Sequence, residues 1–180
     1  MLTLILGGAR SGKSRLARQR ASAAQTSPGQ VCYIATARAG EDAEIEARIA
    51  RHRSDRPADW RTVEAPLGLA DAVEQETRRS AVVIVDCLTI WLSNLLWEYR
   101  QSSPEKAEAA ALAEIERMAA ASRNGGRWVI LVSNEVGSAT VPESPLARAF
   151  RDLQGLVNQR AAQCADEAIL VVAGLPVRLK

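Results

Sequence analysis

The sequence has little of several features that would place a protein in a special class. Its 180 residues carry a formal net charge of only +2 and contain three cysteines, none of them in a C-x-x-C spacing. A charge this small does not favour a nucleic acid or an anionic membrane as partner. An odd number of cysteines without metal-site spacing indicates buried free thiols in a reducing compartment, with neither a disulfide framework nor a zinc site.

Long apolar stretches and segment boundaries are also missing. The first apolar run, residues 2–6, is too short for a secretory signal peptide and leads directly into glycines. No run approaches the roughly 20 residues that a membrane-spanning helix needs, so we expect a cytoplasmic protein with no membrane insertion. Because no repeat, low-complexity tract or long linker divides the chain, we expect residues 1–180 to form a single domain.

Strand-like and helix-like segments alternate along the chain. The β-branched run at residues 81–85 has no polar alternation, which is typical of a strand covered on both faces of a parallel sheet. The alternation predicts an α/β fold with a mostly parallel central sheet and helices on both faces. The expected strands are 2–6, 31–35, 60–64, 81–85, 128–132, 168–172 and 177–179, and the expected helices are 14–24, 41–53, 69–79, 89–100, 104–122 and 146–164.

Residues 7–14 match the phosphate-loop (P-loop) pattern G-x-x-x-x-G-K-[ST] at every fixed position, between an apolar strand and a helix. Its glycines let successive N–H groups face phosphate oxygens, and the helix adds its positive end. Lys13 would then contact the β- and γ-phosphates, and the Ser14 hydroxyl would bind Mg²⁺. The alternative, a glycine-rich turn that binds nothing, fits this strand–turn–helix context poorly. The predicted nucleotide-binding residues here are Gly7, Gly8, Ala9, Arg10, Ser11, Gly12, Lys13 and Ser14.

A P-loop enzyme needs a second magnesium anchor, and this is an acid after an apolar strand. Asp86 follows the strongest strand, so we predict that it binds the metal, although an Asp at this position can instead cap the next helix. Polar residues also follow other expected strands. In a parallel sheet these ends meet at one edge, where ligands bind. These residues are Gly7, Thr36, Glu64, Asp86, Ser133, Asn134 and Glu135.

His52 is the only histidine, and two interpretations remain open for it. On the expected helix 41–53 it shares a face with Ile45 and Ile49, which is typical of a partly buried histidine with a satisfied ring. Alternatively, a neutral imidazole could attack a nucleotide α-phosphate and hold the nucleotide as a phosphoramidate. The flanking arginines would neutralise the phosphates and lower the pKa of the imidazole.

Taken together, these segments resemble the bifunctional adenosylcobinamide kinase / adenosylcobinamide-phosphate guanylyltransferase family of cobalamin biosynthesis. The resemblance covers nearly the whole chain and is most specific over residues 52–64 and 134–159. The segments that carry it are 7–14, 33–37, 47–53, 56–64, 86–89, 133–137, 141–142, 150–155 and 158–159.

The resemblance implies two reactions. ATP or GTP phosphorylates the hydroxyl of the aminopropanol arm of adenosylcobinamide, and GTP then guanylylates a histidine that passes GMP to the new phosphate. It further implies a RecA-like P-loop fold, a homotrimer, and His52 as the guanylylated residue. The nucleotide-contacting positions that it adds to the P-loop are Ala35, Thr36, Ala37, Asp55, Arg56, Pro57, Ala58, Glu64 and Asp86.

Two departures from the family pattern and two alternative functions accompany this expectation. Some members have histidine in place of Arg51, and some have glutamate in place of Asp86, whose shorter side chain would reach Mg²⁺ through water. One alternative is a monofunctional small-molecule P-loop kinase in which His52 is structural. The other is a RecA-like ATP-driven nucleic-acid-binding module, which the near-neutral charge disfavours. Nothing in the composition itself indicates a corrinoid substrate.

Overall fold

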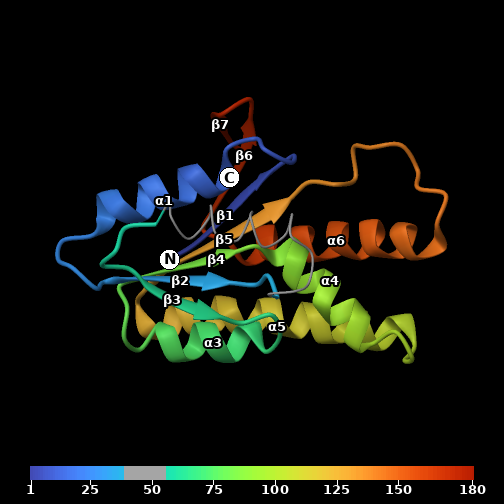
Figure 1. Cartoon of the computed structure of the whole chain (residues 1–180), viewed down its shortest axis with the longest axis horizontal. Helices are drawn as coiled ribbons and strands as arrows, with labels where there is room; N and C mark the ends of the chain where they lie inside the picture. Colours follow the sequence, from blue (N-terminus) through green and yellow to red (C-terminus); the bar gives the residue numbers. More distant parts are fainter. Residues whose placement is uncertain (39–55) are drawn as a thin grey trace.

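The computed structural model describes residues 1–38 and 56–180, which form helical layers on both faces of a central sheet (Figure 1). Within these residues the sheet has seven strands in the order β3-β2-β4-β5-β1-β6-β7. The strands are β1 (Leu2–Gly7), β2 (Val31–Ala35), β3 (Arg61–Glu64), β4 (Val82–Asp86), β5 (Trp128–Asn134), β6 (Glu167–Val172) and β7 (Leu175–Arg178). The helices are α1 (Lys13–Ala24), α3 (Leu69–Glu76), α4 (Leu88–Glu98), α5 (Pro104–Gly125) and α6 (Pro145–Cys164).

The sheet is parallel except for its last strand, β7, which pairs antiparallel with β6. The register aligns the carboxyl ends of the strands. Ala35 lies opposite both Glu64 and Asp86, and Gly7 lies opposite Asn134. The polar residues expected at one edge of the sheet therefore do meet there, and the predicted α/β fold with a mostly parallel sheet is confirmed.

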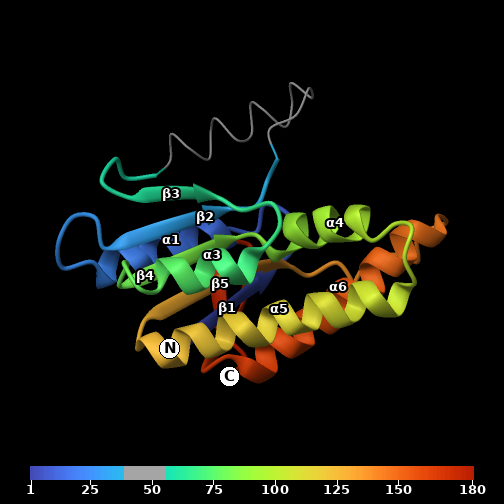
Figure 2. The ribbon, with the colours of Figure 1, turned by 90° about the horizontal axis from the view of Figure 1, so that it is seen from below.

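Two apolar clusters hold the layers together. One lies between the sheet and α1, and includes Ile5, Ala17, Tyr33 and Ile84. The other lies between the opposite face and helices α3, α4, α5 and α6, and contains the buried Trp91. Figures 1 and 2 show α1 on one side of the sheet and α3 and α5 on the other. Because both faces are covered, the strand residues Val82–Val85 are all buried, as their unbroken apolar run predicts.

The element boundaries differ from expectation at a few ends. Helix α5 runs to Gly125, three residues past the expected end, because Gly126 supplies the left-handed φ of 61° that stops it. Helix α3 stops earlier, at Glu76, and the expected helix 41–53 lies outside the described residues. None of the helices in the described ranges is long and apolar enough to cross a membrane.

The cysteines correct one expectation. All three are free thiols, but only Cys32 is fully buried, whereas Cys87 and Cys164 are partly exposed. Burial of Cys32 on β2, followed in importance by the Glu76 carboxylate, raises the pKa of its thiol to about 12. Sequence context placed all three among apolar neighbours and correctly ended a helix at Cys164, but it could not show that this side chain is partly exposed.

Candidate nucleotide-binding site

The P-loop connects β1 to α1, as its motif predicts. Gly12, with a φ of 104°, precedes the first residue of the helix, Lys13. Lys13 is only 6% exposed, and its Nζ donates a hydrogen bond to the carbonyl of Gly8 at 2.6 Å. Ser14 follows in the first helical turn and is half-buried. The loop therefore places a cation and a hydroxyl at the positive end of a helix, where a polyphosphate binds well.

The turn between β6 and β7 supports this loop from behind. The backbone N–H of Gly174 donates to the carbonyl of Ser11 at 2.9 Å. Gly7 packs so closely that an added Cβ would lie 2.4 Å from the carbonyl oxygen of Val171 and 2.7 Å from Ser11 Oγ. The P-loop conformation thus depends on contacts with a segment that lies more than 150 residues away in the sequence.

Asp86 is half-buried at the end of β4, next to Tyr33 on β2. The Tyr33 hydroxyl donates a short hydrogen bond to Asp86 Oδ2. Burial, and then the nearby Asp86 carboxylate, raise the pKa of Tyr33 well above its ordinary value, so its hydroxyl stays a donor at neutral pH. The alternative role of Asp86 as a helix cap is not supported, because Cys87 occupies the N-cap position of α4 without a side-chain cap.

Thr36 lies at the same edge, but its side chain forms hydrogen bonds within the protein and does not face a ligand. It is completely buried, and its hydroxyl donates to the Cys87 carbonyl at 2.8 Å and accepts from the Cys87 N–H at 2.9 Å. The Asn94 side chain donates to the Thr36 carbonyl at 2.9 Å. The half-buried neighbours Ala35 and Ala37 flank it. Of these three predicted contacts, only the two alanines present side chains to the surface.

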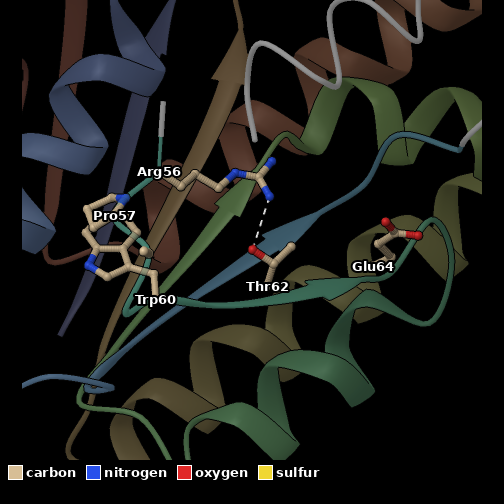
Figure 3. Close-up of a pocket in the computed structure, with 6 residues that line it drawn as sticks. Arg56, Pro57, Trp60, Thr62 and Glu64 are labelled. Atoms are coloured by element: carbon tan, nitrogen blue, oxygen red, sulfur yellow. Dashed lines mark hydrogen bonds between the residues drawn. The ribbon is translucent and has the colours of Figure 1, made fainter. Parts of the chain in front are cut away.

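A pocket of about 470 Å³ opens beside β3 (Figure 3). Thr62 lies opposite Tyr33 in the register and Glu64 lies opposite Ala35, so both side chains share the face that carries Tyr33. Arg56 extends over the Tyr33 ring, with its guanidinium carbon 3.8 Å from the ring centre, and donates to Thr62 Oγ1 at 3.2 Å. The residues lining the pocket are Arg56, Pro57, Ala58, Trp60, Thr62 and Glu64.

The pocket brings together four predicted nucleotide contacts, the consecutive residues Arg56, Pro57 and Ala58 and the more distant Glu64, and adds two residues that sequence reasoning missed, Trp60 and Thr62. Figure 3 shows Pro57 beside the Trp60 ring at one end and Glu64 at the other, with Arg56 reaching towards Thr62 between them. Trp60 is fixed from behind, since its indole N–H donates to Gln25 Oε1 at 2.9 Å. Both missed residues lie inside the segment that carries the family resemblance, and this was the one available signal for them.

Polar residues at the end of β5 make an internal network. Ser133 Oγ donates to Asn158 Oδ1 at 2.7 Å, and the Gln154 amide donates to both of these residues at 3.0 Å. Ser133 and Gln154 are completely buried. The Asn134 N–H is bound by Thr89 Oγ1 at 2.8 Å. Ser133 and Asn134 therefore fasten β5 to α4 and α6, and the polarity of Ser133 has a structural explanation.

Two predicted residues, His52 and Asp55, lie outside the described residues. In the described ranges no three His, Cys, Asp or Glu side chains gather as a metal-binding group. The predicted magnesium site does not require one, because a P-loop metal takes a hydroxyl, one acid, phosphate oxygens and water as ligands. Ser14 at the start of α1 and Asp86 on the sheet face that α1 covers suit that ligand set.

Comparison with known proteins agrees with this geometry. The family described as cobinamide kinase / cobinamide phosphate guanyltransferase matches residues 3–179. The chain belongs to this family. It is 43% identical over 186 residues to the bifunctional adenosylcobalamin biosynthesis protein CobU of Escherichia coli, with both chains fully covered. It is 44% identical to the corresponding protein CobP of Pseudomonas aeruginosa, covering all of this chain and 98% of the relative.

Membership in the cobinamide kinase / cobinamide phosphate guanyltransferase family confirms the resemblance seen in the sequence. It also confirms the expectation of a nucleotide-using transferase, with kinase and nucleotidyltransferase activity in cobalamin biosynthesis. The P-loop and Asp86, the last residue of β4, lie at the carboxyl edge of the sheet, where a doubly covered parallel sheet binds its ligand. The pocket runs along β3 and reaches this edge at Glu64.

Proposed function

We propose that this enzyme phosphorylates adenosylcobinamide with ATP or GTP, and then transfers GMP from GTP to the new phosphate to give adenosylcobinamide-GDP. The observation that carries the proposal is a P-loop at the same sheet edge as Asp86 and as Glu64, which ends the pocket beside β3, in a member of this family. A corrinoid acceptor follows from the family alone, and no described residue is assigned to it.

In this proposal the P-loop holds the triphosphate. Lys13 exchanges its hydrogen bond to the Gly8 carbonyl for phosphate oxygens, and the first N–H groups of α1 add donors. Ser14 and Asp86 would hold Mg²⁺, which neutralises charge that develops on the phosphates during transfer. The Tyr33 hydroxyl bond fixes one oxygen of Asp86 and leaves the other acceptor positions of the carboxylate available.

The pocket beside β3 would take the base and sugar of the nucleotide. Pro57 and Trp60 supply apolar surface at one end, and the Glu64 carboxylate can accept from N–H or O–H donors at the other. Arg56 lies between them as a cation. Such a mixed lining, apolar with a few polar groups, is typical of small-ligand pockets.

His52 is proposed as the nucleophile of the second reaction. A ring nitrogen forms a bond to the α-phosphorus of GTP, and the bond to the bridging oxygen breaks so that pyrophosphate leaves. A phosphate oxygen of adenosylcobinamide phosphate then attacks the same phosphorus, and the histidine leaves with its electron pair. Asp55, next to the pocket residue Arg56 in sequence, is proposed as a further nucleotide contact.

Assembly and location also remain predictions. The expected homotrimer is supported by apolar side chains on the edge strand β7, where Leu175 is 69% exposed and Val177 is 50% exposed, because such edges favour association. The cytoplasmic location and the absence of a nucleic-acid partner rest on the sequence composition.

The decisive experiment is mass spectrometry of the enzyme after incubation with GTP and Mg²⁺. We expect one acid-labile GMP adduct on His52. His52→Ala should abolish guanylyl transfer and retain kinase activity, whereas Lys13→Ala should cripple both reactions because both need the triphosphate in the same loop. Guanylyl transfer that survives in His52→Ala would contradict the covalent route, and absence of any adduct with intact kinase activity would favour the monofunctional kinase.

A further inference from the structure

Tyr33 touches two parts of the candidate site at the same time. Its hydroxyl donates to Asp86 Oδ2, and the guanidinium of Arg56 lies 3.8 Å above the centre of its ring. Only 1% of Tyr33 is exposed, so the ring belongs to the apolar cluster under α1 and cannot swing freely. Two charged groups from distant parts of the chain therefore rest on one rigid side chain.

The strand register explains why a single tyrosine reaches both groups. Tyr33 lies opposite Ile84 on β4, two residues before Asp86, and opposite Thr62 on β3. A side chain that leans along its strand reaches the next residue on the same face of the neighbouring strand. On the other side, Arg56 crosses the ring. Its guanidinium also donates to Thr62 Oγ1 at 3.2 Å, and this hydrogen bond, visible in Figure 3, fixes the end of the side chain.

We propose that Tyr33 is a positioning residue that orients the Asp86 carboxylate through its hydroxyl and the Arg56 guanidinium through its ring. It thereby couples the metal-binding end of the nucleotide site to the pocket beside β3. The proposal rests on the function proposed above, since it takes Asp86 as the metal anchor and Arg56 as a nucleotide contact. Tyr33 itself need not touch the nucleotide, because it is buried beneath both groups.

The two halves of the tyrosine can be tested separately. Tyr33→Phe removes only the hydroxyl and retains the ring beneath Arg56, so it should affect the metal end alone. Tyr33→Leu removes the ring as well and should affect both ends. The measurement is calorimetric titration with a GTP analogue that carries a methylene bridge between the α- and β-phosphates, so that no guanylyl transfer occurs. Each titration is made once with Mg²⁺ and once with EDTA.

For Tyr33→Phe we expect an affinity about tenfold weaker with Mg²⁺, which is the loss typical of one hydrogen bond to a charged group. With EDTA the affinity should stay within about twofold of the original enzyme. In an Asp86→Asn background the Tyr33→Phe change should have no further effect, because it acts through that carboxylate. Tyr99→Phe is the matched control: it removes the hydroxyl of the only other tyrosine and should leave both affinities unchanged.

Equal weakening by Tyr33→Phe with Mg²⁺ and with EDTA would overturn the positioning role, and so would an effect that adds fully to that of Asp86→Asn. A Tyr33→Phe enzyme that binds like the original, while Asp86→Asn weakens Mg²⁺-dependent binding, would overturn this inference alone. If Asp86→Asn leaves Mg²⁺-dependent binding unchanged, the metal anchor of the proposed function fails, and the inference fails with it. A Tyr33→Leu enzyme that binds no more weakly than Tyr33→Phe would overturn the role of the ring beneath Arg56. Should Tyr33→Leu not fold, Tyr33→Phe still decides whether the hydroxyl orients Asp86.

Discussion

Replacing Gly7 by alanine tests whether the P-loop depends on its contact with the C-terminal hairpin. The new Cβ would lie 2.4 Å from the carbonyl oxygen of Val171 and 2.7 Å from Ser11 Oγ, whereas real Cβ contacts are not shorter than 3.0 Å. The serine side chain can rotate, but the carbonyl is part of β6 and can move only if the strand end moves. The φ of 153° at this position adds strain for any residue with a side chain.

The magnitude follows from these two terms. Overpacking by one methyl group costs about 1–3 kcal/mol, and an unfavourable backbone conformation adds about 1 kcal/mol. For a chain of this length each kcal/mol lowers the melting temperature by about 2–4 °C, so Gly7→Ala should melt roughly 4–16 °C lower. Nucleotide affinity should fall by at least about tenfold, since separating the loop from β6 misplaces the N–H groups that face the phosphates.

The assay is thermal unfolding followed by circular dichroism, together with calorimetric titration with GTP. Gly8→Ala is the matched control, because no atom lies within 4 Å of a Cβ added at the exposed Gly8. We expect that control to change the free energy of unfolding by less than about 0.5 kcal/mol. Equal melting temperatures for the two variants would refute the claim that the hairpin fixes the P-loop.

Two further predictions concern the region between β2 and α3. Glu76→Ala should destabilise the fold by about 1–3 kcal/mol in chemical unfolding, because the Glu76 side chain is 7% exposed and pairs with Arg61. The loss stays below that of a fully buried pair because Arg61 is 41% exposed and can turn to water, and Glu98→Ala, from an exposed pair, should cost much less. Cys32, with a thiol pKa of about 12, should resist iodoacetamide at pH 9 until the protein unfolds. Since the unfolded thiol loses its proton near pH 8.5 and the folded one retains it, this group lowers stability as the pH rises from about 8.5 to 12. Equal labelling of native and unfolded protein would contradict the burial of Cys32.

The arrangement of elements could be predicted from the sequence because its signals are local. An unbroken β-branched run over Val82–Val85 indicates a strand with two covered faces, and the structure buries all four residues. The P-loop pattern fixes a strand before Gly7 and a helix from Lys13. Once the sheet is parallel, its strand ends must meet at one edge, so the position of the site followed from the fold.

The contacts within the site could not be predicted in the same way, because they depend on the register between strands. Nothing local indicates that Thr62 lies opposite Tyr33, or that Arg56 reaches back across the ring to it. A polar residue after a strand also looks the same in sequence whether it binds a ligand or its own backbone. The side chains of Thr36 and Ser133 both form hydrogen bonds inside the protein.

The described part of the site bears on how one nucleotide site can serve two reactions, one at the γ-phosphorus of a first triphosphate and one at the α-phosphorus of a second. Each component is held by a hydrogen bond to another part of the protein: Ser11 to the β6–β7 turn, Asp86 to Tyr33, and Trp60 to Gln25. Since these contacts lie within the protein, they hold the loop, the acid and the pocket in place whichever triphosphate binds. Under the proposed function we therefore expect each triphosphate to bind in the same place, while the attacking group changes from the acceptor hydroxyl to the proposed nucleophile His52.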